Sequence, residues 1–440
     1  MSFKETEFGM IPKDWKIKQI GEIGKVVGGG TPRTKVEEYW NGDVSWITPK
    51  DLSGYSDRFI YKGERSITQV GLENSSAKLL PKGTVLFSSR APIGYVAIAG
   101  KDMSTNQGFK SIVCNEKVTN NLFIYYLMKQ KKTNIEMIAG GSTFKEVSGK
   151  VLKEFKIQIP PLNEQKAIAN ILSTLDEKIE INNKINKNLE EMAQAIFRRW
   201  FVDFEFPNEQ GKPYKSSGGE MVESELGLIP KGWKVKTLGD VLLKLEAGNR
   251  PKGGAGNLIE GIPSIGAENI IGLGQYDYSK EKYVTEEYFN NMKKGIVNSG
   301  DVMLYKDGAQ LGRKTMFMDG FPHKRCCVNS HVFILRTNEI ISQLFLYFWL
   351  DQKRVTKSII NLNENSAQPG INQSKVKSLK ILVPKSEIVK DFDETILKMI
   401  KKLFENCNEN SKLEKIRDTL LPKLMSGEIR VPLESENDAL

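Results

Sequence analysis

The chain has 440 residues, of which 39% are hydrophobic and 27% charged, a composition typical of a folded globular protein rather than a disordered one. A single hydrophobic core usually stops growing near about 250–300 residues, so this length favours two or three domains. Lysine and arginine outnumber aspartate and glutamate by 64 to 54, and the net charge of +10 favours a polyanionic partner without identifying it.

The sequence shows no feature of a membrane or secreted protein. It contains no uninterrupted apolar run of about 18 residues, and its first residues lack the apolar core of a signal peptide. A cytoplasmic location without a membrane partner is therefore expected. The cysteines form no CxxC pair and are expected to be reduced core residues (Cys114, Cys326, Cys327 and Cys407).

The opening motif of the chain occurs twice. "GMIPKDWKIKQIG" begins at Gly9, and "GLIPKGWKVKTLG" begins at Gly227, an offset of 218 (227 minus 9). The offset then rises slowly, to 224 where Pro160 of "FKIQIP" meets Pro384 of "LKILVP". An ordered series of matches with one gradual slip indicates a duplicated domain whose second copy has a few more loop residues.

Each copy contains short strand-like runs followed by a long helical stretch. Runs such as "GTVLFSS", "YVAIA", "GDVMLY" and "HVFILRT" are rich in β-branched and aromatic residues and are separated by turn residues, which predicts small mixed sheets with helices in an α+β fold. We predict a first globular domain over 1–160, a long helix over 161–206, a polar connector over 207–225, a second globular domain over 226–384, a second long helix over 385–426 and a tail over 427–440.

Both helical stretches have a heptad seam interrupted by two asparagines. The first seam is Ile168, Leu172, Leu175, Ile179, Asn182, Asn186, Leu189, Ala193, Ile196 and Trp200, and the second, 224 positions later, has Asn406 and Asn410 at the matching places. If each helix packed only on its own domain, nothing would explain a duplicated polar pair. Because polar seam residues fix register, we predict an antiparallel coiled coil with Asn182 opposite Asn410 and Asn186 opposite Asn406.

The sequence lacks recognisable catalytic motifs. Its two histidines, His323 and His331, lie in no HExxH arrangement, and no GxxxxGK[ST] phosphate loop or GxGxxG fingerprint occurs. We therefore expect no catalytic residue and no metal site.

Polar and basic residues instead gather on turns at matching places in the two copies. Lysine attracts phosphate, while arginine, asparagine and glutamine can bind base edges in the major groove. Any one of them alone is more simply a solvated surface residue, so the argument is collective. The candidates are Thr48, Lys50, Ser89, Arg90, Asn106, Gln107, Lys110, Ser142, Thr143 and Lys145 in the first copy, and Asn269, Lys306, Asp307, Arg313, Lys314, Asn329, His331 and Gln368 in the second.

The chemistry of these turns differs between the copies. Asp307 lies near the place that Arg90 has in the first copy. Arginine suits guanine, whereas a carboxylate can accept a hydrogen bond from cytosine N4. One frame with different tips suggests that two different sequences are read by one molecule.

Several motifs occur together: the repeated opening, "GGTPRTK", "YWNGDVSWITPKDL", "SSRAPIG", "NQGFK", "IPPLNEQKAIANILSTLDEKIE", "FRRWFVDFEF" and "IRDTLLPKLMSGEIRV". In these the chain resembles, from end to end, the specificity subunits of type I restriction-modification systems. The second copy departs from the pattern in "VPKSEIVKDF", where the first has "IPPLNEQKAI".

The resemblance implies a non-catalytic subunit whose two target-recognition domains each read half of an asymmetric, bipartite site in double-stranded DNA. It implies that the two helices set the gap between the halves and dock two methyltransferase subunits, which bind S-adenosylmethionine and methylate adenine. A translocating restriction subunit that uses ATP and Mg²⁺ would join them, and the chain itself would bind no cofactor directly.

Two other functions remain open on the residues alone. A sequence-independent nucleic-acid-binding protein would use charge only and would show binding that weakens steeply with salt, but it has no need of diverged loops. A duplicated assembly scaffold would use the loops to bind protein, and a rigid helical spacer suits it nearly as well.

Overall fold

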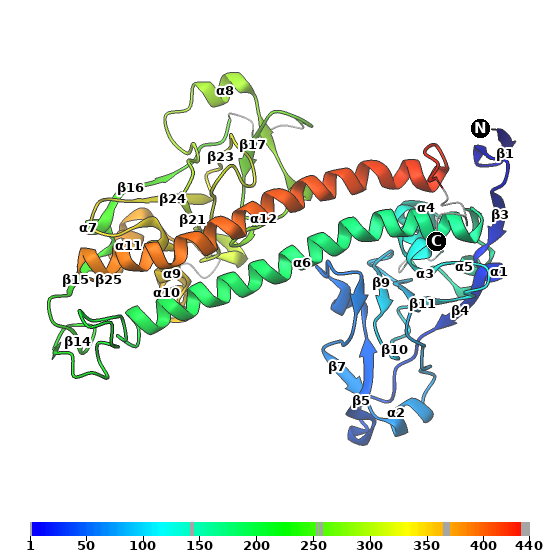
Figure 1. The fold of residues 1–440 in the computed structure, drawn as a ribbon, viewed down its shortest axis with the longest axis horizontal. Helices are drawn as coiled ribbons and strands as arrows, with labels where there is room; N and C mark the ends of the chain where they lie inside the picture. The colour runs from blue at the N-terminus through cyan, green and yellow to red at the C-terminus, as the bar shows by residue number, and fades with distance from the viewer. Residues whose placement is uncertain (1, 141–144, 252–253, 255–257, 364–369, 433–440) are drawn as a thin grey trace, which may run out of the picture. The chain divides into compact units, whose positions relative to one another are not determined.

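The structure is a computed structural model that describes residues 2–140, 145–251, 254, 258–363 and 370–432. The chain divides into two compact units, unit 1 with Met1–Glu180 and Lys412–Leu440 and unit 2 with Ile181–Ser411. The division falls inside the two longest helices, α6 (Leu162–Phe201) and α12 (Ser386–Ser426), so each unit holds one segment of each (Figure 1).

Unit 1 is built on small sheets. Its main sheet has the order β4-β11-β8-β9-β6, with β4 at Gly24–Gly28, β11 at Lys110–Cys114, β8 at Val85–Phe87, β9 at Val96–Ala99 and β6 at Phe59–Ile60. A second sheet has the order β10-β5-β7, with β10 at Ser104–Thr105, β5 at Trp40–Ile47 and β7 at Arg65–Ile67. Two strand pairs complete it, β1 (Phe3–Thr6) with β2 (Gly9–Pro12) and β3 (Lys16–Gln19) with β12 (Lys156–Ile159).

The helices of unit 1 are short apart from its segments of α6 and α12. They are α1 (Ile20–Ile23), α2 (Gln69–Glu73), α3 (Asn121–Gln130), α4 (Lys132–Met137) and α5 (Gly149–Glu154). α3 begins at Asn120, whose side chain caps the helix by accepting a hydrogen bond from the amide of Phe123 at 3.0 Å. The buried side of α3 packs in one core with Ile168 of α6 and Leu424 of α12.

Unit 2 repeats this plan with a larger core. Its main sheet has the order β16-β24-β21-β22, with β16 at Leu242–Ala247, β24 at Val332–Thr337, β21 at Val302–Tyr305 and β22 at Lys314–Met316. The second sheet has the order β20-β17-β23, with β20 at Tyr283–Val284, β17 at Ile262–Ile265 and β23 at Cys327–Val328. The strand pairs are β15 (Lys234–Thr237) with β25 (Lys380–Val383), β13 (Met221–Val222) with β14 (Ile229–Pro230) and β18 (Ile270–Gly272) with β19 (Gln275–Tyr276).

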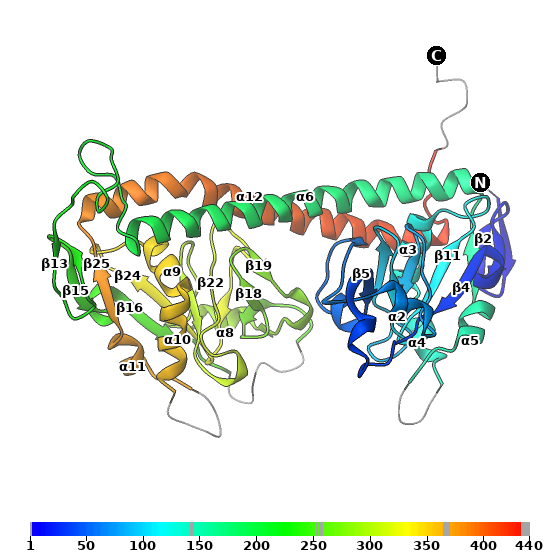
Figure 2. The same ribbon diagram turned by 90° about the horizontal axis from the view of Figure 1, so that it is seen from below.

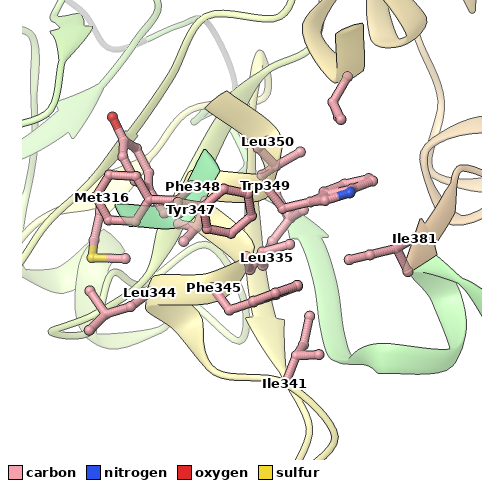
Figure 3. Packing of buried hydrophobic residues seen from close by; sticks show 14 of the residues in the cluster. Met316, Leu335, Ile341, Leu344, Phe345, Tyr347, Phe348, Trp349, Leu350 and Ile381 are labelled. Carbon is pink, nitrogen blue, oxygen red and sulfur yellow. The ribbon is translucent and has the colours of Figure 1, made fainter. Parts of the chain in front are cut away.

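The other helices of unit 2 are α7 (Leu238–Val241), α8 (Glu286–Asn290), α9 (Gln343–Asp351), α10 (Lys353–Asn361) and α11 (Gln373–Lys377). α9 is apolar on nearly every side because it lies inside the core. Phe345 and Phe348 of α9 are buried with Met316 of β22, Leu335 of β24 and Ile381 of β25 (Figure 3).

The duplication predicted from the sequence is confirmed in the fold. β3 pairs antiparallel with β12 in unit 1, as β15 does with β25 in unit 2. The same ion pair recurs beside these strands, between Lys156 and Glu7 at 2.8 Å and between Lys380 and Glu225 at 3.0 Å. The chain is therefore an α+β protein made of two copies of one domain.

α6 and α12 run antiparallel within each unit (Figure 2). In unit 1, Arg417 of α12 bonds Asp176 of α6 at 2.7 Å, while Leu424, later in α12, packs in one core with Ile168, earlier in α6. In unit 2, the ring of Trp200 near the end of α6 lies 6.1 Å from that of Phe392 near the start of α12.

The segment predicted as a polar connector is folded. α6 ends at Phe201, and the ring of Phe206 then stacks between Tyr214, at 4.6 Å, and Trp233, at 5.1 Å. Strand β13 forms within the same segment and pairs with β14. The polar composition hid this structure, because scattered apolar side chains pack it on the core around Trp233: Tyr214 and Val222 within the segment, and Phe206 directly before it.

Candidate nucleic-acid interface

A hydrogen-bonded turn after strand β8 presents Arg90 at the surface of unit 1. The amide of Ser89 donates to the carbonyl of Gly108 at 2.7 Å. The amide of Val147 donates to the carbonyl of Ser89 at 2.9 Å. We call these two bonds the turn frame, since they hold the main chain directly before Arg90 from both sides.

The same turn frame recurs after strand β21 in unit 2. The amide of Lys306 donates to the carbonyl of His331 at 3.1 Å, and the amide of Ile371 donates to the carbonyl of Lys306 at 2.9 Å. Asp307 therefore occupies in unit 2 the position that Arg90 occupies in unit 1.

A glycine closes the turn in each unit. The amide of Gly94 donates to the carbonyl of Ser88, and the amide of Gly312 donates to the carbonyl of Tyr305, both at 3.0 Å. Their φ values of 90° and 86° lie in the left-handed region that favours glycine. The turn thus keeps its shape in both units, although the side chains at its tip differ.

Two of the predicted asparagines support the turn. Oδ1 of Asn106 accepts from the amide of Gly108 at 2.9 Å, and Oδ1 of Asn329 accepts from the amide of His331 at 2.8 Å. Asn329 is only 6% exposed. The side chain of Asn329 is therefore buried and holds the loop, while its contact with DNA stays a prediction.

Three charged side chains meet at the tip of the turn in unit 1. Nε of Arg90 donates to Glu146 at 2.9 Å, and Nζ of Lys110 donates to the other oxygen of the same carboxylate at 3.3 Å. Burial alone would raise the pKa of Glu146, but the hydrogen bonds from Arg90 and Lys110 outweigh it and lower that pKa. Two cations around one carboxylate leave a net positive charge at this surface.

The tip in unit 2 has a different set of side chains. Nδ1 of His331 lies 2.9 and 2.7 Å from the two carboxylate oxygens of Asp307. Nζ of Lys306 lies 5.3 Å from the centre of the Phe333 ring. Burial and the charge of Asp307 raise the pKa of Tyr305, so this tyrosine stays a neutral hydrogen-bond donor near neutral pH.

The predicted residues after β5 form a small capped turn. The amide and hydroxyl of Thr48 both donate to Asp51, at 2.7 and 2.6 Å, so Thr48 supports the turn. Lys50 and Lys145 are exposed, and Lys50 pairs with the exposed Glu64 at 2.7 Å. Such a pair is weak and leaves Lys50 available to an anion.

Three further predicted side chains have little exposed surface and partners inside the fold. Ser89 is fully buried and its hydroxyl donates to the carbonyl of Gly108 at 3.2 Å. Asn269 is 1% exposed and bonds its own loop. Lys314 has a side chain that is 12% exposed and pairs with Asp351 of α9 at 3.1 Å. These side chains are bonded inside the fold, and their contacts with DNA stay predictions.

Two predicted residues bond their neighbours while remaining at the surface. Arg313 donates to the carbonyl of Ile270 at 3.0 Å and to Gln310 at 2.6 Å. Gln107 is exposed and accepts from the hydroxyl of Thr31. The candidates Ser142, Thr143 and Gln368 lie outside the described residues.

Sequence reasoning missed Glu146 and Arg65. Glu146 was overlooked because an acidic residue does not suggest DNA binding, although its place beside Lys145 in a basic loop was a signal. Arg65 lies over the ring of Trp40, with its guanidinium carbon 3.5 Å from the ring centre. The sequence spacing does not predict the contact between Arg65 and Trp40, since the two residues are 25 positions apart (65 minus 40) and only the pairing of their strands brings them together.

The four seam asparagines meet in two layers inside unit 2. Nδ2 of Asn182 donates to Oδ1 of Asn410, and Nδ2 of Asn406 donates to Oδ1 of Asn186, both at 2.9 Å. Asn182, Asn406 and Asn410 are buried, with at most 7% of their surface exposed. The pairing is the one that the antiparallel seam predicts.

Among the described residues, no cluster of three or more histidine, cysteine, aspartate or glutamate side chains could hold a metal ion. Within the same part of the chain, no helix is both long and apolar enough to span a membrane.

Comparison with known proteins agrees with the duplicated architecture. The family model described as the type I restriction modification DNA specificity domain matches twice, at residues 12–191 and 230–418. The MjaIX specificity subunit of a type I restriction enzyme from Methanocaldococcus jannaschii is 38% identical, over 98% of this chain and 96% of that protein. The MjaVIII specificity subunit from the same organism is 25% identical over the same shares.

A solved structure shares the fold. The S subunit of a type I restriction-modification system from M. genitalium superposes with a TM-score of 0.57 at 20% identity, covering 94% of this chain and 96% of that one. The two family matches, the turn frame present in both units and the full-length relative lead to one conclusion. The chain belongs to the type I restriction-modification DNA specificity family, as its non-catalytic specificity subunit.

Proposed function

We propose that each unit reads one half of an asymmetric, bipartite site in double-stranded DNA. The observation that carries this proposal is the pair of equivalent turns with different tips, Arg90 in unit 1 and Asp307 in unit 2. A protein that binds DNA through charge alone needs no difference between its two copies. A reader of two unlike half-sites needs it, because arginine and carboxylate side chains suit different base edges.

The helices are proposed as the spacer between the half-sites. α6 has 40 residues and α12 has 41, and a helix rises about 1.5 Å per residue, so each is about 60 Å long. The asparagine layers fix one register between them, since a shift would leave buried amides unpaired.

Two methyltransferase subunits are proposed to dock on the helical region. An exposed apolar row on α6 supports this, because Ile181, Ile185 and Met192 follow helical spacing and are 51%, 38% and 50% exposed. An apolar row on a polar helix suits the face of a partner helix. S-adenosylmethionine would bind in these subunits and ATP with Mg²⁺ in a restriction subunit, all of them acting on DNA in the cytoplasm.

The test is to map methylated adenines in cells that express this chain with its methyltransferase subunit. The expected motif has two specified halves and an unspecified gap. Absence of any motif would favour binding through charge alone or a scaffold role.

A spacer variant sharpens the test. Seven residues are inserted into α6 after Glu180 and seven into α12 before Lys412, where the chain passes from one unit to the other, so that both helices lengthen together and the asparagine layers stay paired. Seven residues add about 10 Å, which is about three base pairs of DNA. The gap should lengthen by about three base pairs while both halves stay unchanged, and altered halves would contradict the spacer role.

A further inference from the structure

The tip residue of each turn frame has a partner side chain of opposite character, and this arrangement extends the proposed function on which it rests. We propose that Arg90 and Asp307 each read one base edge, and that Glu146 and His331 are positioning residues that orient them. Arg90 is assigned to guanine in the first half-site. Asp307 is assigned to a base with an exocyclic amine, cytosine or adenine, in the second half-site.

The geometry of Arg90 suits guanine. Its bond to Glu146 uses Nε, and neither terminal nitrogen has a hydrogen-bond partner among the described residues. The side chain is 48% exposed. A guanidinium held at Nε presents its two terminal nitrogens as donors that match O6 and N7 of guanine.

Glu146 is itself fixed, which a positioning residue requires. Its amide donates to the carbonyl of Gly140 at 2.9 Å, and the amide of Gly140 donates back to the carbonyl of Glu146 at 3.1 Å. Lys110, whose side chain is 17% exposed, bonds the carboxylate oxygen that Arg90 does not use. The carboxylate therefore has few orientations, and its hydrogen bond to Nε of Arg90 restricts the orientation of the guanidinium in turn.

In unit 2 the donor and acceptor roles are exchanged, so the tip residue accepts and its partner donates. A carboxylate only accepts hydrogen bonds, so Nδ1 of His331 is the donor to Asp307. The main chain of His331 is held by Asn329 and by its place in the turn frame. Asp307, with a side chain 28% exposed, keeps acceptor capacity for an amine of cytosine or adenine.

A merely structural role for the Arg90–Glu146 pair is a poor explanation. Half-exposed ion pairs contribute little to stability. The partner also differs in unit 2, where Gly370 occupies the bridge position of Glu146 and His331 bonds the tip residue instead. If the partner orients the tip residue toward its base, a different tip residue is expected to have a different partner.

The experiment uses the assembled methyltransferase complex. Methylated motifs are mapped for wild type, Arg90→Ala, Glu146→Ala and Glu146→Gln, together with Asp307→Ala and His331→Ala. Glu7→Ala is the matched control, since Glu7 forms an ion pair with Lys156 at 2.8 Å with similar exposure on the same unit.

Arg90→Ala and Glu146→Ala should both relax the same guanine position of the first half-site, by on the order of 10- to 100-fold, and leave the second half-site unchanged. Glu146→Gln should relax it less, because the amide oxygen still accepts a hydrogen bond. Asp307→Ala and His331→Ala should relax one position of the second half-site, and Glu7→Ala should relax none.

Several results would overturn the inference. If Arg90→Ala relaxes the guanine position and Glu146→Ala does not, Glu146 does not position it. If Arg90→Ala weakens methylation at every sequence equally, Arg90 contacts phosphate instead of a base. If wild type methylates no two-part motif at all, the proposed function itself fails, a result distinct from the other two.

Discussion

Asn182 of α6 and Asn410 of α12 share a hydrogen bond of 2.9 Å inside unit 2. Asn182 also donates to Glu409 at 2.8 Å, and Asn410 donates to Asn183 at 2.8 Å. Buried amides that lose a partner destabilise a fold, whereas paired ones fix one register between helices.

The first prediction concerns this pair. Asn182→Ala and Asn410→Ala should each lower the free energy of unfolding by about 1–3 kcal/mol, because each removes a hydrogen bond from a buried amide. The double variant should cost less than the sum, with a coupling of about 0.5–3 kcal/mol in denaturant unfolding. Asn188→Ala, at an exposed position of α6, is the control. Additive losses would show that the pair does not act as a unit.

The second prediction concerns Arg58, whose side chain is only 3% exposed and which bonds Glu180 at 2.9 Å. Glu180→Ala should destabilise unit 1 by about 3–5 kcal/mol in thermal unfolding, because it leaves a buried guanidinium without its main counter-charge. Glu64→Ala removes the partner of Lys50 in an exposed pair and should change stability by less than about 1 kcal/mol. Equal effects of the two variants would contradict the prediction.

The third prediction concerns pH. Burial, with the charges of Asp351 and Glu191, raises the pKa of Glu190 from 4.5 to about 7. Between these values the folded chain keeps a proton that the unfolded chain has released, so this group makes stability fall as pH rises from 4.5 to about 7. Glu190→Gln should therefore stabilise the protein by about 1–2 kcal/mol at pH 8 and by much less below pH 4.5.

Thermal unfolding at acid and alkaline pH measures this difference. Glu394→Gln, at an exposed position of α12, is the control and should shift both midpoints equally. Burial also raises the pKa of Asp393 to about 6, so Asp393 likewise makes stability fall as pH rises toward 6. A Glu190→Gln variant with an unchanged pH slope would contradict the prediction.

The fourth prediction concerns the folded segment after α6. Phe206→Ala removes a ring stacked between Tyr214 and Trp233, which should destabilise unit 2 by about 3–5 kcal/mol. Trypsin should then cleave faster after the exposed Lys215. Phe8→Ala, which removes a phenylalanine 36% exposed on unit 1, should leave both stability and cleavage near wild type.

The fold could be predicted from the sequence where a pattern repeats. The duplicated opening motif predicted two copies of one domain, and the heptad seam predicted the antiparallel helices because buried asparagines admit few pairings. The segment around Phe206 could not be predicted, since two aromatic residues separated by polar ones form no periodic signal.

The sequence predicted which turns correspond in the two units, but it predicted only part of what their side chains do. The residues around Arg90 and Asp307 do meet at equivalent turns, as their order in the two copies suggested. Ser89 and Asn329 have the right chemistry for DNA, but burial decides that they hold the turn. Glu146 could not be chosen from the sequence, because its role depends on a contact between segments 56 residues apart.

The turn frame consists of main-chain hydrogen bonds, and none of its bonds depends on the side chain at position 90 or 307. A substitution at either tip therefore alters the exposed side chain while the backbone that carries it keeps its hydrogen bonds. If the tips read bases as proposed, point mutation changes one half-site at a time at little risk to folding. A lineage carrying this protein can acquire new sequence preferences in small viable steps.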